Sequence, residues 1–140
     1  MTADEEAIVA QTVAYCWAID GRNFDALRDV FLSDGHANYG GVEHEGVDAV
    51  IAKCSEVLSP LDASQHVVST HQVNVDGDRA SSRCYFHAQH VRRAADGGPN
   101  YVVAGSYVDD WERTGSGWRI RRRVLNTIWT EGNVGVVRPG

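Results

Sequence analysis

The chain has 140 residues, of which 43% are hydrophobic and 23% charged, and its formal net charge is −6. This composition is typical of one globular domain with room for a core or a pocket. The negative charge argues against binding of nucleic-acid backbones, and no apolar run approaches the roughly 18 residues of a membrane span. We therefore expect a single domain over residues 1–140, with a C-terminal tail from about residue 131 to residue 140, that binds neither nucleic acid nor membrane.

The cysteines and the N-terminus indicate the compartment. Cys16, Cys54 and Cys84 are far apart and form no C-x-x-C motif, which favours reduced thiols packed as small hydrophobic residues. The segment MTADEEAIVA is acidic and has no basic stretch before an apolar one, so we expect no secretory signal. The sequence therefore predicts a cytoplasmic protein.

The first helix is predicted from its ends and its apolar stripe. Thr2 and Glu5 have capping-box spacing, and Gly21 suits a helix exit. The stripe consists of residues that recur at helical intervals: Ile8, Thr12, Cys16 and Ile19.

Two more helices and a short strand are predicted before residue 60. Asn23 is expected to cap a short helix that ends at Ser33–Gly35, and a short strand follows at His36–Tyr39. A third helix is predicted over about Val47–Leu58, before Pro60.

After Pro60 the hydrophobic pattern changes from helical to alternating. Four long strands are predicted, at Gln65–Val75, Arg79–Arg93, Tyr101–Arg113 and Trp118 to about Thr130. Helices followed by antiparallel strands indicate an α+β fold with the helices on one sheet face. Strands of this length usually bend, and a bent sheet leaves a cone-shaped cavity under the helices.

Asp20 is a carboxylate close to the apolar stripe of the first helix. At 100° per residue it lies on one flank of the stripe, and Tyr15 lies on the other. The negative end of the helix and burial both disfavour the anion of Asp20. An acid so placed suits proton transfer or the fixing of a histidine tautomer. The other interpretation is a solvated polar turn.

The six histidines show no metal-binding pattern. H-x-H and H-E-x-x-H motifs are absent. Strand alternation predicts that His87 and His90 point to opposite faces of their strand, and that His66 and His71 do the same on theirs. We therefore expect no metal site. His66 is the favoured functional candidate because it opens the first long strand, where the sheet meets the helices.

The basic run Arg119–Arg123 provides a candidate cation. Alternation places Trp118, Ile120 and Arg122 on one strand face, so Arg122 would point into the cavity if the other two face the core. There it could bind a carboxylate or a developing oxyanion. An ion pair at a sheet surface or a subunit contact is the other interpretation.

Three segments resemble the SnoaL-like branch of the nuclear transport factor 2-like superfamily: YCWAIDGRNFDALRDVF (15–31), SQHVVSTHQVNVDGDRA (64–80) and GSYVDDWERTGSGWRIRRR (105–123). The likeness runs from about Ala3 to Trp129. Relatives of this branch are scytalone dehydratase, bile-acid dehydratase, hexachlorocyclohexane dehydrochlorinase and ketosteroid isomerase. The resemblance implies a strongly bent antiparallel sheet wrapped around N-terminal helices, a cone-shaped cystatin-like α+β barrel. It does not fix the reaction, since this fold carries many chemistries.

The resemblance also implies roles for single residues. Asp20 and His66 match the aspartate–histidine pair of the dehydratase-like members, and Tyr15 matches a tyrosine of the bile-acid dehydratase branch. Later strands are expected to supply polar residues, with the register uncertain by one or two positions: His87, and Arg122 or Arg123.

These residues predict an enzyme without a cofactor. His66 would remove a proton next to a carbonyl, and Tyr15 or Arg122 would stabilise the enolate. The reaction would be a dehydration or another elimination, or a double-bond isomerisation, of a hydrophobic cyclic carbonyl compound such as a steroid, polyketide or terpenoid. Trp17 and Phe86 are expected to line the pocket. The alternatives are a polyketide cyclase and a small-molecule-binding module without catalysis.

The outer sheet face predicts self-association. It is expected to carry Tyr85, Tyr107, Trp111 and part of the arginine run, more aromatic surface than a solvated sheet usually shows. We therefore expect a homodimer or a higher homo-oligomer.

Overall fold

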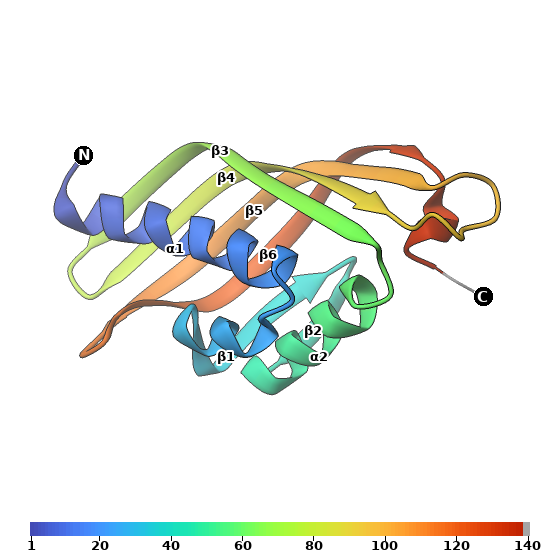
Figure 1. The fold of residues 1–140 in the computed structure, drawn as a ribbon. Coiled ribbons are helices and arrows are strands. Elements are labelled where there is room, and N and C mark those ends of the chain that lie inside the picture. Colours follow the sequence, from blue (N-terminus) through green and yellow to red (C-terminus); the bar gives the residue numbers. More distant parts are fainter. Residues whose placement is uncertain (139–140) are drawn as a thin grey trace.

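The computed structural model describes residues 1–138 as a layer of helices packed on a single sheet (Figure 1). The helical elements are α1 (Ala3–Asp20), a 3-10 helix η1 (Phe24–Asp29), α2 (Val47–Leu58) and a second 3-10 helix η2 (Val134–Val136). The strands are β1 (Phe31–Tyr39), β2 (Val42–Glu45), β3 (Ala63–Asp76), β4 (Arg79–Val91), β5 (Asn100–Thr114) and β6 (Gly117–Gly132). Among the described residues no helix is long and apolar enough to cross a membrane.

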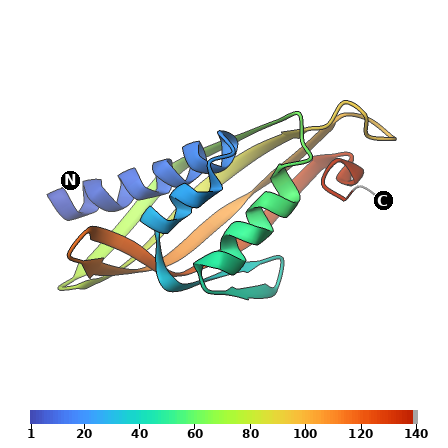
Figure 2. The ribbon, with the colours of Figure 1, turned by 60° about the horizontal axis from the view of Figure 1, so that its bottom comes forward.

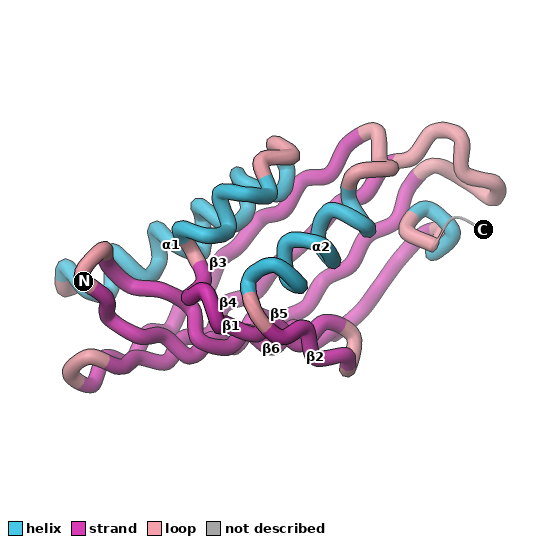
Figure 3. Tube along the Cα trace, turned by 90° about the horizontal axis from the view of Figure 1, so that it is seen from below, coloured by secondary structure: helices cyan, strands magenta, loops and turns pink. Residues whose placement is uncertain are grey.

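The six strands form one open sheet in the order β2-β1-β6-β5-β4-β3. Every neighbouring pair is antiparallel except β1 and β6, which are parallel. Helices α1 and α2 lie on the same side of this sheet (Figures 2 and 3). The α+β class with helices on one sheet face is confirmed, but the sheet is mixed and does not close into a barrel.

The two ends of α1 differ in how far they follow the prediction. The Thr2 hydroxyl accepts a hydrogen bond from the Glu5 amide at 3.2 Å, as the capping box predicts. At the other end Gly21 has φ −83°, and the left-handed conformation falls on Arg22, with φ 60°. The Arg22 guanidinium donates to the Ile19 carbonyl and to the Ser64 hydroxyl, both at 2.9 Å. These bonds fix the end of α1 beside the start of β3.

The segment after α1 departs from the predicted short helix. The 3-10 helix η1 ends at Asp29, and Asn23 makes no capping side-chain hydrogen bond. Strand β1 begins at Phe31 and continues through Ser33–Gly35, which was predicted to end the helix. Helix α2 has the predicted bounds.

Two of the register shifts in the sheet change the side-chain alternation at candidate residues. In β3 the register shifts between Ser69 and Gln72, and Thr70 has φ 59°. As a result His71 turns toward α1, where its Nε2 lies 2.8 Å from the Thr12 hydroxyl. The expectation that His66 and His71 lie on opposite faces is therefore wrong, because a β-bulge adds a residue to one strand.

The second irregularity lies in β6, opposite the step from Asp110 to Trp111. Trp118 and Ile120 face the core as expected, but the next inward side chain is that of Arg123. Arg122 points outward and forms an ion pair with Glu43. The prediction that Arg122 enters the cavity is wrong for this reason.

The outer sheet face carries fewer aromatic residues than predicted. Tyr85 is 54% exposed on that face, but Tyr107 and Trp111 are each only 1% exposed and belong to the core. Asp109 shares the inner face of β5 with them and is itself buried. Because Asp109 is charged, the alternation of β5 in the sequence does not identify the face it shares with Tyr107 and Trp111 as the buried one.

The predicted C-terminal tail is partly built into the domain. Strand β6 extends to Gly132, and η2 buries Val136 completely. The Arg92 guanidinium donates to the carbonyls of Gly135 and Val136 at 2.8 and 3.1 Å. Residues 139 and 140 lie outside the described residues.

Candidate active site

The last residue of α1 and the start of β3 form a carboxylate–imidazole pair. Asp20 Oδ1 lies 2.7 Å from His66 Nδ1, and Asp20 Oδ2 accepts the His66 backbone N–H at 2.7 Å. The Ser64 hydroxyl also donates to Oδ1, at 2.8 Å. Asp20 is therefore held by three donors from β3, and the Arg22 guanidinium holds Ser64 in turn.

The charge of Asp20 follows from these donors. Burial, the largest influence, raises its pKa, but the hydrogen bonds from the His66 ring and backbone and from Ser64 outweigh it. The net pKa lies below the ordinary value of 3.8, so Asp20 is an anion at neutral pH. Burial acts in the expected direction, but the expected net rise in the pKa of Asp20 is wrong, because that expectation left out the three donors.

The anion of Asp20 also determines the tautomer of His66. A carboxylate only accepts hydrogen bonds, so His66 Nδ1 carries a proton, and Nε2 of the neutral ring is left as an acceptor. The His66 side chain is only 7% exposed and lines a cavity under α1 and α2. The pair thus presents a hydrogen-bond acceptor, able to take a proton, to that cavity.

Two phenols on another wall of the cavity supply a donor. The hydroxyls of Tyr15 and Tyr39 lie 2.7 Å apart, and Cys54 Sγ lies 3.8 Å from each. Burial raises the pKa of both phenols well above 10, so they remain protonated. When one hydroxyl donates to the other, the accepting hydroxyl keeps its own proton for a ligand oxygen.

A buried ion pair holds the Tyr15 ring from behind. Arg123 and Asp109 are almost completely buried, and their two hydrogen bonds measure 2.7 and 2.9 Å. The Arg123 guanidinium carbon lies 4.4 Å from the ring centroid of Tyr15 and 3.9 Å from that of Tyr107. The cation therefore packs against both aromatic rings, which meet edge to face with centroids 5.7 Å apart, and this contact fixes the position of Tyr15.

His90 provides a second buried imidazole in the cavity. Its ring lies 5.7 Å from that of His66, edge to face, and its Nδ1 lies 3.1 Å from the Tyr101 carbonyl oxygen. Because a carbonyl only accepts, Nδ1 carries the proton and Nε2 is an acceptor. Burial, followed by the influence of His66, lowers the pKa of His90 to about 4. His90 is thus neutral at pH 7.

The cavity between these groups has a volume of about 160 Å³. Its apolar wall consists of side chains from both layers: Ile19, Val57, Leu58, Phe86, Ala88, Val103, Tyr107 and Leu125. Phe86 and Tyr107 stack with ring centroids 4.5 Å apart. For comparison, an apolar cavity of about 150 Å³ binds one benzene ring. In this conformation the cavity matches one six-membered ring.

The structure brings together four of the predicted site residues and separates three others. Asp20, His66, Tyr15 and Phe86 are at the cavity or its supporting pair. The other three lie outside it: Trp17 is 77% exposed, Arg122 pairs with Glu43 at 3.0 Å, and His87 contacts Trp129 on the outer face. Odd and even positions of β4 point to opposite faces, so His87 cannot reach the cavity.

Sequence reasoning missed Tyr39, Cys54, Lys53 and His90 as cavity residues. A signal for His90 was present, because it continues the inward alternation of Cys84, Phe86 and Ala88. The signals in the sequence were weaker for Tyr39, Cys54 and Lys53. The resemblance implies either Arg122 or Arg123 on the last strand, and the structure places Arg123 against the Tyr15 ring.

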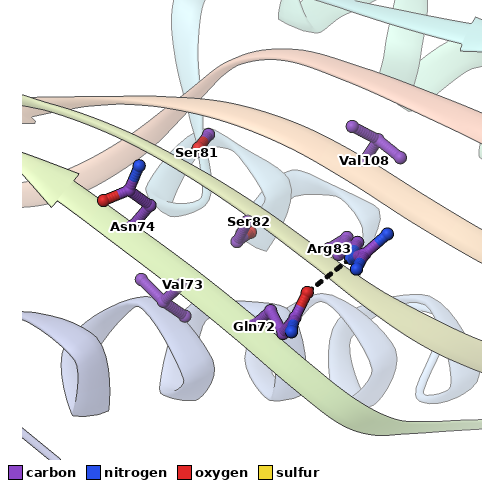
Figure 4. A pocket seen from close by; sticks show the side chains of 7 residues that line it. All are labelled: Gln72, Val73, Asn74, Ser81, Ser82, Arg83 and Val108. Carbon is purple, nitrogen blue, oxygen red and sulfur yellow. Dashed lines mark hydrogen bonds between the residues drawn. The ribbon is translucent and has the colours of Figure 1, made fainter.

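A larger hollow lies elsewhere on the sheet and has a different character. It measures about 550 Å³ and is lined by residues of β3, β4 and β5 (Figure 4): Gln72, Val73, Asn74, Ser81, Ser82, Arg83 and Val108. Its one charged side chain, Arg83, donates to Gln72 at 2.6 Å. No acid–base pair faces this hollow, so the smaller cavity is the candidate active site. Across residues 1–138, no group of three or more His, Cys, Asp or Glu side chains could hold a metal ion.

Comparison with known proteins defines the family. The SnoaL-like domain model matches residues 1–124, so the chain belongs to the SnoaL-like family. An uncharacterized protein of Mycobacterium tuberculosis is 36% identical over 126 residues, which cover 87% of this chain and 84% of that protein.

Solved structures agree with this assignment at the level of the fold. A nuclear transport factor 2-like protein from Salmonella enterica superposes with TM-score 0.80 at 17% identity, covering 94% of each chain. A candidate scytalone dehydratase from Novosphingobium aromaticivorans has TM-score 0.82 and 22% identity, covering 91% of this chain and 86% of that one. A type 2 hexachlorocyclohexane dehydrochlorinase has TM-score 0.83 and 16% identity, covering 95% and 90%. The chain has the nuclear transport factor 2-like fold.

The buried neutral His90 predicts a loss of stability in mild acid. Its pKa is about 4 in the folded protein and near 6.5 in the unfolded chain, so protons favour unfolding as the pH falls through this interval. Between about pH 7 and pH 4.5 this group alone should cost about 2–3 kcal/mol of unfolding free energy. Burial lowers the pKa of His71 as well and adds in the same direction.

Urea unfolding at both pH values tests this prediction. His90→Gln should lose less stability between the two pH values than the wild type. His87→Gln, on the exposed outer face, should keep the wild-type difference. An equal difference in His90→Gln and wild type would show that His90 is not held neutral by burial.

Proposed function

We propose that this protein is an acid–base enzyme that removes a proton from a carbon next to the carbonyl of a cyclic compound, and then eliminates a β-substituent or moves a double bond. The observation that carries the proposal is the Asp20–His66 pair, 2.7 Å apart, at a cavity that also holds the Tyr15–Tyr39 hydroxyls. A dehydratase candidate and a dehydrochlorinase are among the structural neighbours, which supports elimination.

The proton transfer begins at His66. Its Nε2 takes the proton from the α-carbon, and the electron pair of that C–H bond forms the carbon–carbon double bond of an enolate. Asp20 stabilises the resulting imidazolium through the Nδ1–H bond. The free hydroxyl proton of the Tyr15–Tyr39 pair binds the enolate oxygen, where negative charge develops.

The same proton completes the reaction. The imidazolium can return it to a β-hydroxyl group, which departs as water while the carbonyl re-forms. It can instead return it to the vinylogous carbon, which moves the double bond. His90 Nε2 accepts a hydrogen bond from a substrate hydroxyl and so orients the ring, because neutral His90 has no Nε2 proton to give.

The volume of the cavity limits the size of the substrate. A volume of about 160 Å³ suits one six-membered ring, whereas ligand pockets for drug-sized molecules measure about 300–1,000 Å³. A monocyclic carbonyl compound therefore fits this conformation better than a steroid or a tetracyclic polyketide. A polyketide cyclase would use the same pair, but its larger substrate fits less well.

A binding module without catalysis is the second candidate. The apolar wall of the cavity alone would serve such a function. The polar groups favour catalysis, because binding of an apolar ring gains nothing from an aspartate anion held against a histidine by three hydrogen bonds.

Exchange of an acidic C–H with solvent deuterium separates these candidates. With cyclohexenones and β-hydroxycyclohexanones, the wild type should catalyse exchange at the α-carbon, followed by mass spectrometry or NMR. His66→Ala should abolish exchange, and Asp20→Asn should lower it by about 10²-fold or more, the usual scale for a positioned acid–base group.

Trp17→Ala provides the matched control, because that aromatic side chain is exposed outside the cavity and should leave exchange unchanged. Exchange that persists in His66→Ala would remove His66 as the base. Ring ketones that bind the wild type tightly without any exchange would favour the binding module.

Self-association is also proposed, through the outer sheet face. Its most exposed apolar side chains are close to a hollow of about 340 Å³ and come from three strands: Val67, Tyr85, Ile128 and Trp129. We expect a second copy of this chain to cover them. Light scattering at micromolar concentration should give at least a dimer mass, and Tyr85→Glu should reduce it. A monomer mass for the wild type would contradict the proposal.

A further inference from the structure

Lys53 is the single lysine of the chain and one of the residues that line the cavity. Helix α2 contributes two pairs of residues there, each spaced by one turn. Cys54 and Leu58 are only 5% and 4% exposed and form the inner pair, whereas Lys53 and Val57 are partly exposed. Because residues four apart lie on the same helix face, Lys53 and Val57 form the rim of the cavity on α2.

The ammonium group of Lys53 makes only one weak ion pair within the described residues. It makes no hydrogen bond there, and its nearest carboxylate is that of Glu56, 3.9 Å away with a side chain 72% exposed. Such a pair contributes little at a surface. The Lys53 side chain itself is 35% exposed, so its stem is largely packed at the rim.

The remaining charges around the cavity are already paired or neutral. Asp20 is held by His66 and Ser64, and Arg123 is held by Asp109 behind the aromatic rings. The phenols and His90 are neutral at pH 7. Lys53 is therefore the one cavity-lining cation without a hydrogen-bonded partner in the part of the chain that the structure describes.

We propose that Lys53 is a specificity-determining residue that binds an acidic substituent of the substrate at the mouth of the cavity. This inference rests on the proposed function and narrows its substrate to a monocyclic carbonyl compound that carries a carboxylate. The ring fills the cavity of about 160 Å³, so a substituent must extend to the rim, which Lys53 helps to line. A carboxylate there gains a charge-assisted hydrogen bond that a neutral group does not.

A matched pair of ligands tests the charge preference. The probes are 3-oxocyclohexane-1-carboxylate and its methyl ester, which share the ring and the ketone and differ in charge. Binding is measured by calorimetry at low salt. The wild type should bind the carboxylate about five- to tenfold more tightly than the ester, as expected for one partly exposed charge-assisted contact. Raising the salt to about 0.5 M should reduce the preference.

Three variants separate a charge effect from a structural one. Lys53→Met keeps most of the stem and should abolish the preference, whereas Lys53→Arg should retain most of it. Arg79→Met makes the same change in net charge at an exposed side chain outside the cavity and should preserve the wild-type ratio. A wild type without preference, or a Lys53→Met variant that weakens both ligands equally, would overturn the proposal.

Chemical modification gives a second readout that does not depend on catalysis. Lys53 and the N-terminal amine are the two amines that an amine-reactive acetyl ester modifies. The carboxylate should slow acetylation of Lys53 and not of Met1, and the methyl ester should protect Lys53 less. Absence of protection would contradict the contact. If the wild type prefers the carboxylate but catalyses no deuterium exchange, the proposed reaction is wrong and the role of Lys53 stands. If it catalyses exchange but shows no preference, the role of Lys53 is wrong and the reaction stands.

Discussion

The hydrogen bonds between Asp20 and β3 connect the two layers of the protein where its chemistry is placed. Without donors, a carboxylate at the C-terminal end of a helix would be disfavoured both by the helix dipole and by burial. The Ser64 hydroxyl, the His66 backbone and the His66 ring compensate for both effects. The same bonds that keep Asp20 ionised therefore determine which nitrogen of His66 faces the cavity.

The buried ion pair of Arg123 and Asp109 performs a similar task for the phenols. A pair so deeply buried gains little net stability over an apolar replacement, but the loss of either partner is costly. In this protein the ion pair is important mainly because of where it places the Arg123 guanidinium. The guanidinium between the rings of Tyr15 and Tyr107 limits where Tyr15 can lie, and hence where its hydroxyl meets Tyr39. The hydrogen-bond donor of the cavity, the Tyr15–Tyr39 pair, thus depends on the Arg123 cation. The acceptor, His66, depends on the Asp20 anion.

The order of the helices and the four long strands could be predicted from the sequence because the hydrophobic period changes after Pro60, whereas the short strand β2 was not predicted. The predicted bounds of α2 coincide with the observed ones, and the four long strands differ from prediction only at their ends. The Asp20–His66 pair was expected from the resemblance of the sequence to the SnoaL-like branch. The helix and strand predictions rely on regular patterns, which local sequence carries well.

The errors at His71 and Arg122 share one physical cause, which is the breaking of strand alternation. A bulge at Thr70 turns His71 inward, and a register shift in β6 turns Arg123 inward in place of Arg122. Neither carries a glycine at the bulge to mark it, and Thr70 adopts a positive φ that is rare for a β-branched residue. The charges of Asp109 and Arg123 also make two core positions look solvated, although each neutralises the other.

The hydrogen bond from Asp20 places a proton on His66 Nδ1 and leaves Nε2 of the neutral ring for the cavity. NMR of the ¹⁵N-labelled histidine rings at neutral pH tests this directly, with the His66 signals assigned by comparison with His66→Gln. We predict a proton on Nδ1, a bare Nε2, and loss of this fixed tautomer in Asp20→Ala. A neutral His66 with its proton on Nε2, or a tautomer unaffected by Asp20→Ala, would contradict it.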